Sequence, residues 1–375
     1  MAGIYLHIPF CRQACNYCDF HFSTSLRHKE ELINAMFNEL VLQKNFLQGA
    51  ALDTIYLGGG TPSLLSTDTL NVLFDRISEL FTIHADAEIT LEANPDDLTA
   101  TYLRTLRHTP VNRLSIGIQS FREEDLTMMN RAHTAKQALR CVPEAADFGF
   151  ENMSVDLIYG LPFSGMAGWR KNVEQVLQLP VNHLSCYCLT VENRTLLAKQ
   201  VQEGSIPPVD EDSAASQYEY LLDITEAAGI PWYEISNFSK PGFESRHNTS
   251  YWKGIPYLGI GPSAHSYNGE FRQSNVRSNA AYVQSIEKKV VPAEKEILSP
   301  EQQFNETVLT SLRTRKGITL AQLRTKFGAG AVDTLVRQSE KSRERELLVL
   351  DETALRLTNK GLLFADAIAS EFFIV

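Results

Sequence analysis

The sequence has no apolar run long enough to cross a membrane, since no stretch approaches about 18 consecutive apolar residues. It shows no N-terminal basic segment followed by an apolar core, so we expect no export signal. It also has no basic run, and 35 Lys and Arg against 45 Asp and Glu give a net charge of −10. An acidic chain of this kind is a poor candidate for non-specific nucleic-acid binding. We therefore expect no nucleic-acid partner, and membrane contact only through another protein.

Cysteine is scarce, and half of it is concentrated in one place. The 375 residues contain six cysteines, and three of them are Cys11, Cys15 and Cys18. This usage favours a metal site in a reducing, cytoplasmic protein over a disulfide framework. The remaining three, Cys141, Cys186 and Cys188, are interpreted as small buried hydrophobic residues.

The stretch YLHIPFCRQACNYCDFHF, residues 5–22, organises the rest of the chain. Its C-x3-C-x2-C spacing follows a short apolar strand. Three thiolates on one loop suit a 4Fe-4S cube in which one iron lacks a protein ligand, because such cubes normally take four cysteines. An open position of this kind can hold a substrate. Zinc, with His21 as a fourth ligand, is the alternative at this point.

Strand and helix patterns alternate along the first 235 residues. Strands are expected at 3–9, 53–57, 87–93, 112–120, 152–162, 183–191 and 230–235, with helical spacing at 27–47, 67–81, 98–107, 134–148, 167–177 and 212–228. Repeated units of this kind predict parallel strands with right-handed crossovers. We expect a partial (β/α)6 barrel, with a doubly wound open sheet as the alternative.

In a barrel, sites lie at the carboxyl ends of the strands. That rule brings the following to one rim: Cys11–Cys18, Gly58–Ser63, Glu92, Gln119, Asp156 and Cys188. The glycines after the second strand would let a backbone approach a ligand closely. They form neither a G-x-G-x-x-G motif nor a phosphate loop with its lysine. Taken singly, each of Glu92, Gln119, Arg131 and Asp156 is better interpreted as an ordinary rim residue in a salt bridge.

The cysteine spacing after an N-terminal strand resembles the radical S-adenosylmethionine (SAM) superfamily. The resemblance implies that Cys11, Cys15 and Cys18 ligate a 4Fe-4S cluster whose open iron chelates SAM. The four polar residues of the rim suit SAM only when they are taken together. It also implies an electron donor, such as a flavodoxin or a ferredoxin.

Further motifs resemble one branch of that superfamily: YLHIPFC, LGGGTPS, LEANP, RLSIGIQSF, NRAH and VDLIYGLP. The branch contains oxygen-independent coproporphyrinogen III dehydrogenase and related haem chaperones. The resemblance implies SAM contacts from Tyr5, Tyr17, Gly59, Gly60, Thr61, Glu92, Gln119, Arg131 and Asp156. In the dehydrogenase some of these positions, with the counterpart of Cys188, serve a second SAM, and whether one binds here stays open.

Two features separate this chain from the dehydrogenase. Phe20 stands where the dehydrogenase carries a fourth cysteine. The first strand would start at residue 3, so a substrate-covering N-terminal segment is expected to be absent. Both features disfavour oxidative decarboxylation.

The segment 236–298 is expected to be an irregular extension of the barrel. Residues 234–268 are rich in Gly, Pro, Ser and aromatic residues, so loops and short strands rather than helix are expected there. It contains His247, Tyr251 and Trp252 in an H-N-x-x-Y-W pattern that resembles the haem chaperones. Histidine is a common haem ligand and aromatic rings pack on porphyrins. The alternative is a structural histidine beside aromatic side chains that fill the open side of the barrel. His265 is a weaker ligand candidate.

Residues 299–375 are expected to form a small winged-helix-like domain, which we interpret as a cover or partner surface. The sequence therefore predicts three parts: a radical SAM barrel at 1–235, the extension at 236–298 and this domain. The leading hypothesis is a haem chaperone that binds the cluster, SAM and haem and delivers haem to an acceptor protein. The alternatives are a coproporphyrinogen III dehydrogenase and a zinc-dependent regulator.

Overall fold

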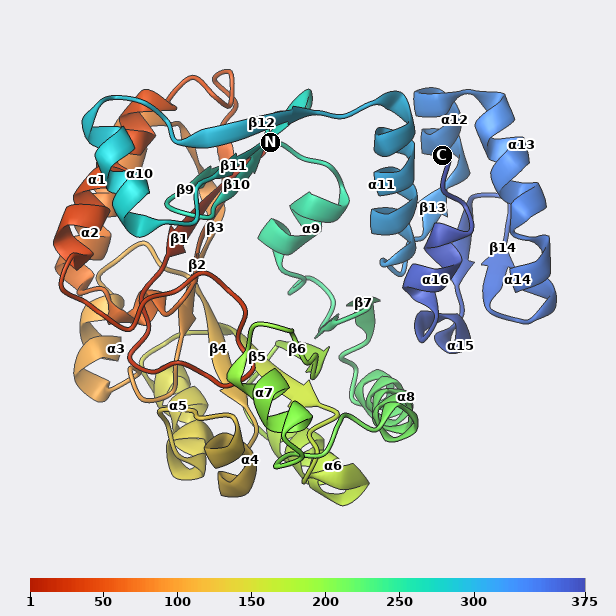
Figure 1. The fold of residues 1–375 in the computed structure, drawn as a ribbon, viewed down its shortest axis with the longest axis horizontal. Helices are drawn as coiled ribbons and strands as arrows, with labels where there is room; N and C mark the ends of the chain where they lie inside the picture. Colours follow the sequence, from red (N-terminus) through yellow and green to blue (C-terminus); the bar gives the residue numbers. More distant parts are fainter. Residues whose placement is uncertain (375) are drawn as a thin grey trace.

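The computed structural model describes residues 1–374, which are arranged around one twelve-stranded sheet (Figure 1). Its strand order is β12-β11-β10-β9-β1-β2-β3-β4-β5-β6-β8-β7. The six central strands pair in parallel, each with the next: β1 Ala2–Ile8, β2 Leu52–Gly59, β3 Ile83–Ala93, β4 Arg113–Gln119, β5 Asn152–Tyr159 and β6 His183–Cys188. Parallel strands need crossover connections, and helices provide them.

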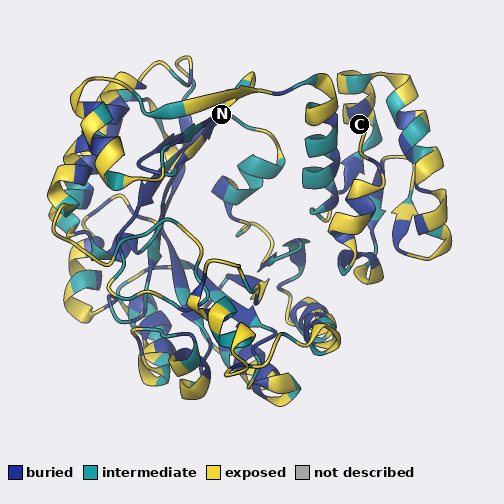
Figure 2. Cartoon of the chain, viewed as in Figure 1, coloured by how far each residue is buried: buried dark blue, intermediate teal, exposed yellow. Residues whose placement is uncertain are grey.

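The crossover helices pack against one face of these strands, and the side chains between the two layers are buried (Figure 2). They are α1 Lys29–Leu42, α2 Thr67–Leu80, α3 Ala100–Leu106, α4 Glu123–Met128, α5 Ala135–Asp147 and α6 Gly165–Leu177. The 3-10 turn η1 Pro62–Leu64 follows β2, and α7 Leu196–Gln202 and α8 Glu211–Ala227 follow β6. Helix α2 shows why such segments form. The Ser66 side chain accepts a hydrogen bond from the Thr69 N–H at the N-cap, and Leu70, Leu73 and Ile77 bury a single stripe.

The sheet curves into a barrel that remains open. Within residues 1–374 no hydrogen-bonded pairing joins the outermost strands β12 and β7. The partial-barrel prediction is confirmed. On successive strands the residues facing away from the helices are polar or small, including Gly3, Tyr5 and His7 on β1, whereas Ile4, Leu6 and Ile8 are fully buried in the core.

Additional strands lengthen the sheet on both sides. On the β1 side lie β9 Tyr257–Ile260, β10 His265–Tyr267, β11 Phe271–Asn275 and β12 Ala293–Ile297. On the β6 side lie β7 Trp232–Glu234 and β8 Asn237–Ser239. Strand β9 pairs in parallel with β1, and β8 pairs antiparallel with β6.

The expectation that residues 234–268 contain no helix is wrong, because α9 Arg246–Trp252 lies there. A second helix of the extension, α10 Asn279–Glu287, follows outside that stretch. The side chains of Ser245 and Ser278 accept backbone N–H bonds at the two N-caps. Serine N-caps are helix-start signals that the surrounding Gly and Pro residues outweighed in the sequence pattern.

The C-terminal part has the winged-helix-like arrangement expected from the sequence (Figure 1). It comprises α11 Pro300–Leu312, β13 Ile318–Thr319, α12 Leu320–Phe327, α13 Ala329–Gln338, α14 Glu340–Glu344, β14 Leu348–Leu350, β15 Ala354–Leu357, α15 Asn359–Leu362 and α16 Ala365–Ser370. It contacts the barrel through the Arg313 carbonyl, which accepts from the Ile235 N–H, and through an Arg315–Glu226 ion pair. No helix within residues 1–374 is long and apolar enough to span a membrane.

Candidate cofactor site

The three clustered cysteines lie on the loop that leaves β1, at the carboxyl end of the parallel strands. All three are half-buried and none forms a disulfide. Burial raises the pKa of the Cys18 thiol to about 11. Binding of iron must therefore displace protons from this loop, as thiolate ligation generally requires.

Donors from the end of β2 and from the segment between α4 and α5 reach the cysteine sulfurs. Arg131 Nη1 donates to Cys15 Sγ at 3.3 Å, and Thr61 Oγ1 donates to Cys11 Sγ at 3.5 Å. Hydrogen bonds to sulfur and nearby positive charge stabilise thiolates and tune the potential of iron–sulfur clusters. The donor set around the loop therefore fits a thiolate-held cluster.

A single metal ion would need donors that converge on one point. Among the His, Cys, Asp and Glu side chains of residues 1–374, no group of three does so. A cube binds each thiolate through a different iron, so its thiolates need not converge.

Arg131 joins the cysteine loop to two strands. Its Nη2 donates to Gly117 O at 2.7 Å and to Asn94 Oδ1 at 2.8 Å, and its Nη1 also reaches the Tyr17 hydroxyl at 3.5 Å. Most of its donors are thus committed to the protein. The guanidinium positions the loop, and its Nε is buried with no hydrogen-bond partner among residues 1–374.

The glycines after β2 make room for the chain itself. A Cβ on Gly60 would lie 2.6 Å from the Phe10 carbonyl oxygen, and one on Gly59 would lie 2.6 Å from the His7 ring. The Gly60 N–H donates to Ile8 O at 2.8 Å. Close approach of β2 to the cysteine loop is therefore one reason for glycine at these positions.

Glu92, at the end of β3, is held at both carboxylate oxygens. Tyr56 Oη donates to Oε1 at 2.8 Å and the Gly59 N–H donates to Oε2 at 3.1 Å. Burial raises the pKa of Glu92 to about 7, and Asp156 adds to this increase. The two hydrogen bonds oppose it because they favour the ionised form.

Asp156, on β5, is the second carboxylate of this region, and burial raises its pKa to about 6. Ser115 Oγ donates to it at 3.4 Å. The Arg113 guanidinium lowers the pKa of both Asp156 and Glu92. Arg113 is buried, and none of its side-chain nitrogens has a hydrogen-bond partner within residues 1–374.

Sequence reasoning missed Arg113 and Tyr56, although both occupy the face of their strands that carries the predicted residues.

Gln119 ends β4 in the left-handed region, at φ 68°. A non-glycine residue in that region carries strain, and such residues are frequent at functional sites. Its Nε2 lies 3.0 Å from where a Cβ on Gly117 would be, so Gly117 leaves room for the amide.

A second polar network, which sequence reasoning did not find, supports the mouth from the side of β3. Asp97 accepts from Ser63 Oγ at 2.7 Å and from Arg12 Nε at 2.9 Å. Arg12 belongs to the cysteine loop, so this network fixes the loop to the ends of β2 and β3.

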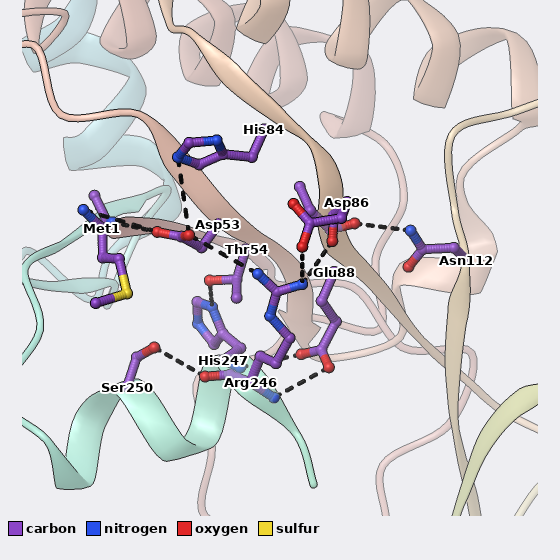
Figure 3. Close-up of polar contacts among 12 residues, drawn as sticks. Met1, Asp53, Thr54, His84, Asp86, Glu88, Asn112, Arg246, His247 and Ser250 are labelled. Atoms are coloured by element: carbon purple, nitrogen blue, oxygen red, sulfur yellow. Dashed lines mark hydrogen bonds and ion pairs between the residues drawn. The ribbon is translucent and has the colours of Figure 1, made fainter. Parts of the chain in front are cut away.

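His247 lies on α9, buried against the first halves of β2 and β3 (Figure 3). Its ring nitrogens are both engaged: Nδ1 with Thr54 Oγ1 at 2.7 Å and Nε2 with Tyr251 Oη at 2.9 Å. The backbone N–H groups of Arg246 and His247 both donate to the Glu88 carboxylate at 3.0 Å. In this arrangement His247 has the contacts of a structural histidine packed beside aromatic side chains. Ligation of iron would require one of its two ring contacts to open.

The other members of the H-N-x-x-Y-W motif are half-buried. The Trp252 ring packs beneath the Arg313 guanidinium, whose Cζ lies 5.7 Å from the ring centroid. The motif thus lies between the barrel and the C-terminal domain (Figure 1). His265 is exposed on β10.

The interpretation of Cys188 as a buried hydrophobic residue is wrong. Cys188 is exposed at the carboxyl end of β6, whereas Cys141 and Cys186 are buried. The reason is positional, because the last residue of a strand faces the barrel mouth and not the layer between strands and helices.

Comparison with known proteins defines the class first. Residues 5–174 match the radical SAM superfamily, and residues 298–364 match the HemN C-terminal domain. The solved structure of coproporphyrinogen III oxidase (HemN) from Escherichia coli superposes with a TM-score of 0.86, over 99% of this chain and 90% of that one. At 22% identity this likeness shows the fold. The chain has the fold and the three-cysteine loop of a radical SAM protein.

The curated relatives narrow this to one family. The protein is 34% identical to the heme chaperone HemW of Bacillus subtilis, over 99% of both chains. It is 36% identical to HemW of Mycobacterium tuberculosis, over 98% of this chain and 93% of that protein. Escherichia coli HemW is 38% identical over 70% of this chain and 69% of its own. The chain belongs to the HemW family.

Proposed function

We propose that this protein is a haem chaperone of the radical SAM type, which binds haem and delivers it to an acceptor protein. The observation that carries the proposal is the match over nearly the whole chain to relatives named heme chaperone HemW. Phe20 supports it against the dehydrogenase alternative. The Phe20 side chain is 72% exposed beside the cysteine loop, at the position where the dehydrogenase has a cysteine.

The cluster would be held by Cys11, Cys15 and Cys18. The Arg131 and Thr61 donors favour their thiolate forms. Held there, a cluster of this class would supply an electron to SAM. The protein itself provides the three thiolates, hydrogen bonds to sulfur and partial exclusion of water.

SAM would bind over the loop, among residues that converge from the five strands β1 to β5 and the segments that follow them. Glu92 and Asp156 would accept from ribose hydroxyls, since buried carboxylates form strong charge-assisted hydrogen bonds. The other proposed contacts are Tyr5, Tyr17, Gly59, Gly60, Thr61, Gln119 and Arg131.

Haem would bind at the segment that carries His247, Tyr251 and Trp252. Burial lowers the pKa of His247 to about 3, so the imidazole is neutral, as an iron ligand must be. The contacts with Thr54 and Tyr251 imply that α9 shifts when haem binds. Tyr251 and Trp252 are half-buried and their rings would face the porphyrin.

The implied partners are haem, a haem-acceptor protein and an electron donor such as a flavodoxin or a ferredoxin. The free cysteines and the absence of a spanning helix within residues 1–374 support a cytoplasmic location, with membrane contact only through an acceptor.

Parallel incubation with haem and with coproporphyrinogen tests the proposal. Anaerobically purified protein is titrated with haem and, in a separate sample with SAM and reductant, assayed for protoporphyrinogen. We expect haem binding and no decarboxylation. His247→Ala should weaken haem binding or change the haem spectrum, whereas His108→Ala, at an exposed histidine outside the proposed site, serves as the matched control. Catalytic formation of protoporphyrinogen, with no haem binding above that of His247→Ala, would establish the dehydrogenase instead.

A further inference from the structure

Tyr56 makes a direct contact with the proposed SAM site. It lies on β2 two residues before Gly58, on the face that looks into the barrel, and its hydroxyl donates to Glu92 Oε1 at 2.8 Å. The Gly59 N–H holds the other carboxylate oxygen at 3.1 Å. With one hydrogen bond to each oxygen, the plane of the carboxylate is fixed and a lone pair on each oxygen is left for a ligand.

The Tyr56 ring belongs to a cluster of three nearly parallel rings. Its centroid lies 5.0 Å from that of His247, at an interplanar angle of 25°, and 6.1 Å from that of Tyr5, at 28°. Tyr5 and His247 lie 6.3 Å apart at 28°. Packed aromatic rings in a buried site restrict one another's orientation.

Two glycines leave the space that this cluster needs. A Cβ on Gly58 would lie 2.9 Å from the Tyr56 ring and 3.0 Å from Glu92 Oε1. A Cβ on Gly3 would lie 2.6 Å from Thr54 Oγ1 and 3.3 Å from the His247 ring. The ring cluster is therefore built into the first two strands.

We infer that Tyr56 is a positioning residue of the SAM site: its hydroxyl orients Glu92 for SAM, and its stack on His247 makes the H-N-x-x-Y-W helix part of the support for that site. The inference rests on the proposed contact between Glu92 and SAM. Glu88 accepts from the His247 N–H and Thr54 Oγ1 contacts the His247 ring. These contacts position His247 and, through the ring stack, help to position Tyr56.

The titratable groups around Glu92 come from several elements, and they define the effect of pH. The charged or titratable groups that interact electrostatically with Glu92 are Tyr5, Cys11, Tyr56, Arg113, Asp156, Tyr187 and Tyr251. The Tyr56 hydrogen bond favours ionised Glu92. Its removal should shift the loss of SAM affinity on acidification to higher pH.

Equilibrium dialysis of SAM against the anaerobic, cluster-loaded full chain tests the inference. The variants are Tyr56→Phe, Glu92→Gln, their combination, and His247→Ala. Tyr218→Phe is the matched control, because Tyr218 is a buried tyrosine whose hydroxyl donates to Ile235 O at 2.8 Å. Iron content and melting temperature are measured for each variant.

We expect Tyr56→Phe to weaken SAM binding about tenfold with iron content unchanged, since a hydrogen bond to a charged group is lost. The double variant should bind SAM no more weakly than Glu92→Gln, because Tyr56 acts through Glu92. His247→Ala should weaken SAM binding by a smaller factor, and Tyr218→Phe should match the wild type.

The outcomes separate the inference from the proposed function. Unchanged SAM affinity in Glu92→Gln would remove Glu92 from the SAM site and overturn the inference, whereas the proposed haem-chaperone function is decided by the separate incubations with haem and coproporphyrinogen. Weak binding in Glu92→Gln with wild-type binding in Tyr56→Phe would overturn the role of Tyr56 alone. Additive losses in the double variant, or equal losses in Tyr218→Phe, would show that Tyr56 contributes only to the stability of the fold.

Discussion

Arg131 Nη1 lies 3.3 Å from the sulfur of Cys15, at the point where the loop after β1 meets the segment after β4. This contact brings a positive charge to a proposed cluster ligand. The same guanidinium donates to Gly117 O and Asn94 Oδ1, so its position is fixed from two strands. Arg131 therefore supports the cysteine loop, and its charge would tune the potential of a cluster bound there.

Arg131→Gln should lower the midpoint potential of the cluster, because a positive charge next to sulfur stabilises the reduced, more negative state. We expect a shift on the order of tens of millivolts. Arg131→Lys keeps the charge and should shift the potential less, although a lysine cannot make all the contacts of the guanidinium with Cys15, Asn94 and Gly117. A redox titration followed by electron paramagnetic resonance measures both, and a potential unchanged in Arg131→Gln would refute the proposed tuning.

Replacement of any of Cys11, Cys15 and Cys18 by serine should abolish the cluster, because a three-point site has no spare ligand. Cys188→Ser is the control, since Cys188 is exposed at the end of β6. Iron and sulfide per chain after anaerobic reconstitution give the answer. If Cys188 proved as necessary as Cys18, the three-ligand assignment would be wrong.

Gly60→Ala should reduce iron content as well as SAM binding. The added Cβ would lie 2.6 Å from the Phe10 carbonyl and 2.8 Å from the Ile8 carbonyl, so the cysteine loop must move. Gly330→Ala is the matched control, because a Cβ there meets nothing within 4 Å. Full iron loading of Gly60→Ala with SAM binding lost would show instead that the glycine serves the ligand directly.

Tyr251→Phe and Thr54→Val separate the two ring nitrogens of His247. If Nε2 ligates haem iron, Tyr251→Phe removes its competing partner at 2.9 Å and should raise haem affinity a few-fold. Thr54→Val removes the partner of Nδ1 and should lower affinity, because that contact orients the ring. The opposite ranking in haem titrations would assign the ligand to Nδ1.

The buried Glu39 should make stability depend on pH. Burial raises its pKa to about 7, although Tyr282, the Gly261 N–H, Asn275 and Gln43 all donate to it. A raised pKa in the folded state means that the folded protein holds the proton at higher pH than the unfolded chain. Its stabilising contribution is therefore complete below about pH 4.5 and is lost as pH rises through 7.

Cluster-free protein and its Glu39→Gln variant, unfolded in urea at several pH values, test this. The wild type should lose up to about 3 kcal/mol more than the variant between pH 4.5 and 8. Near pH 5 the variant should be less stable than the wild type by roughly the cost of one mispaired buried amide, about 1–3 kcal/mol. Parallel curves for the two proteins would show that Glu39 does not titrate in this range.

The sequence alone determined the features that depend on local spacing. Cys11, Cys15 and Cys18 lie within eight residues, so one loop must carry them whatever surrounds it. The spacing of apolar residues in each strand and helix likewise follows from the burial of one of its faces. The alternation of these two spacings predicted the parallel strands and the partial barrel. The ends of those strands then indicated the mouth, with Glu92 and Asp156.

Tertiary structure decided what depends on register between distant segments. Tyr56 faces Glu92 because β2 and β3 pair with Tyr56 opposite Thr90, and no pattern within β2 shows that partner. His247 meets Thr54 from 193 positions away and has both ring nitrogens engaged. Such contacts are stabilised by the joint burial of two segments that are distant in the sequence. The pattern within either segment shows the residue but not its partner.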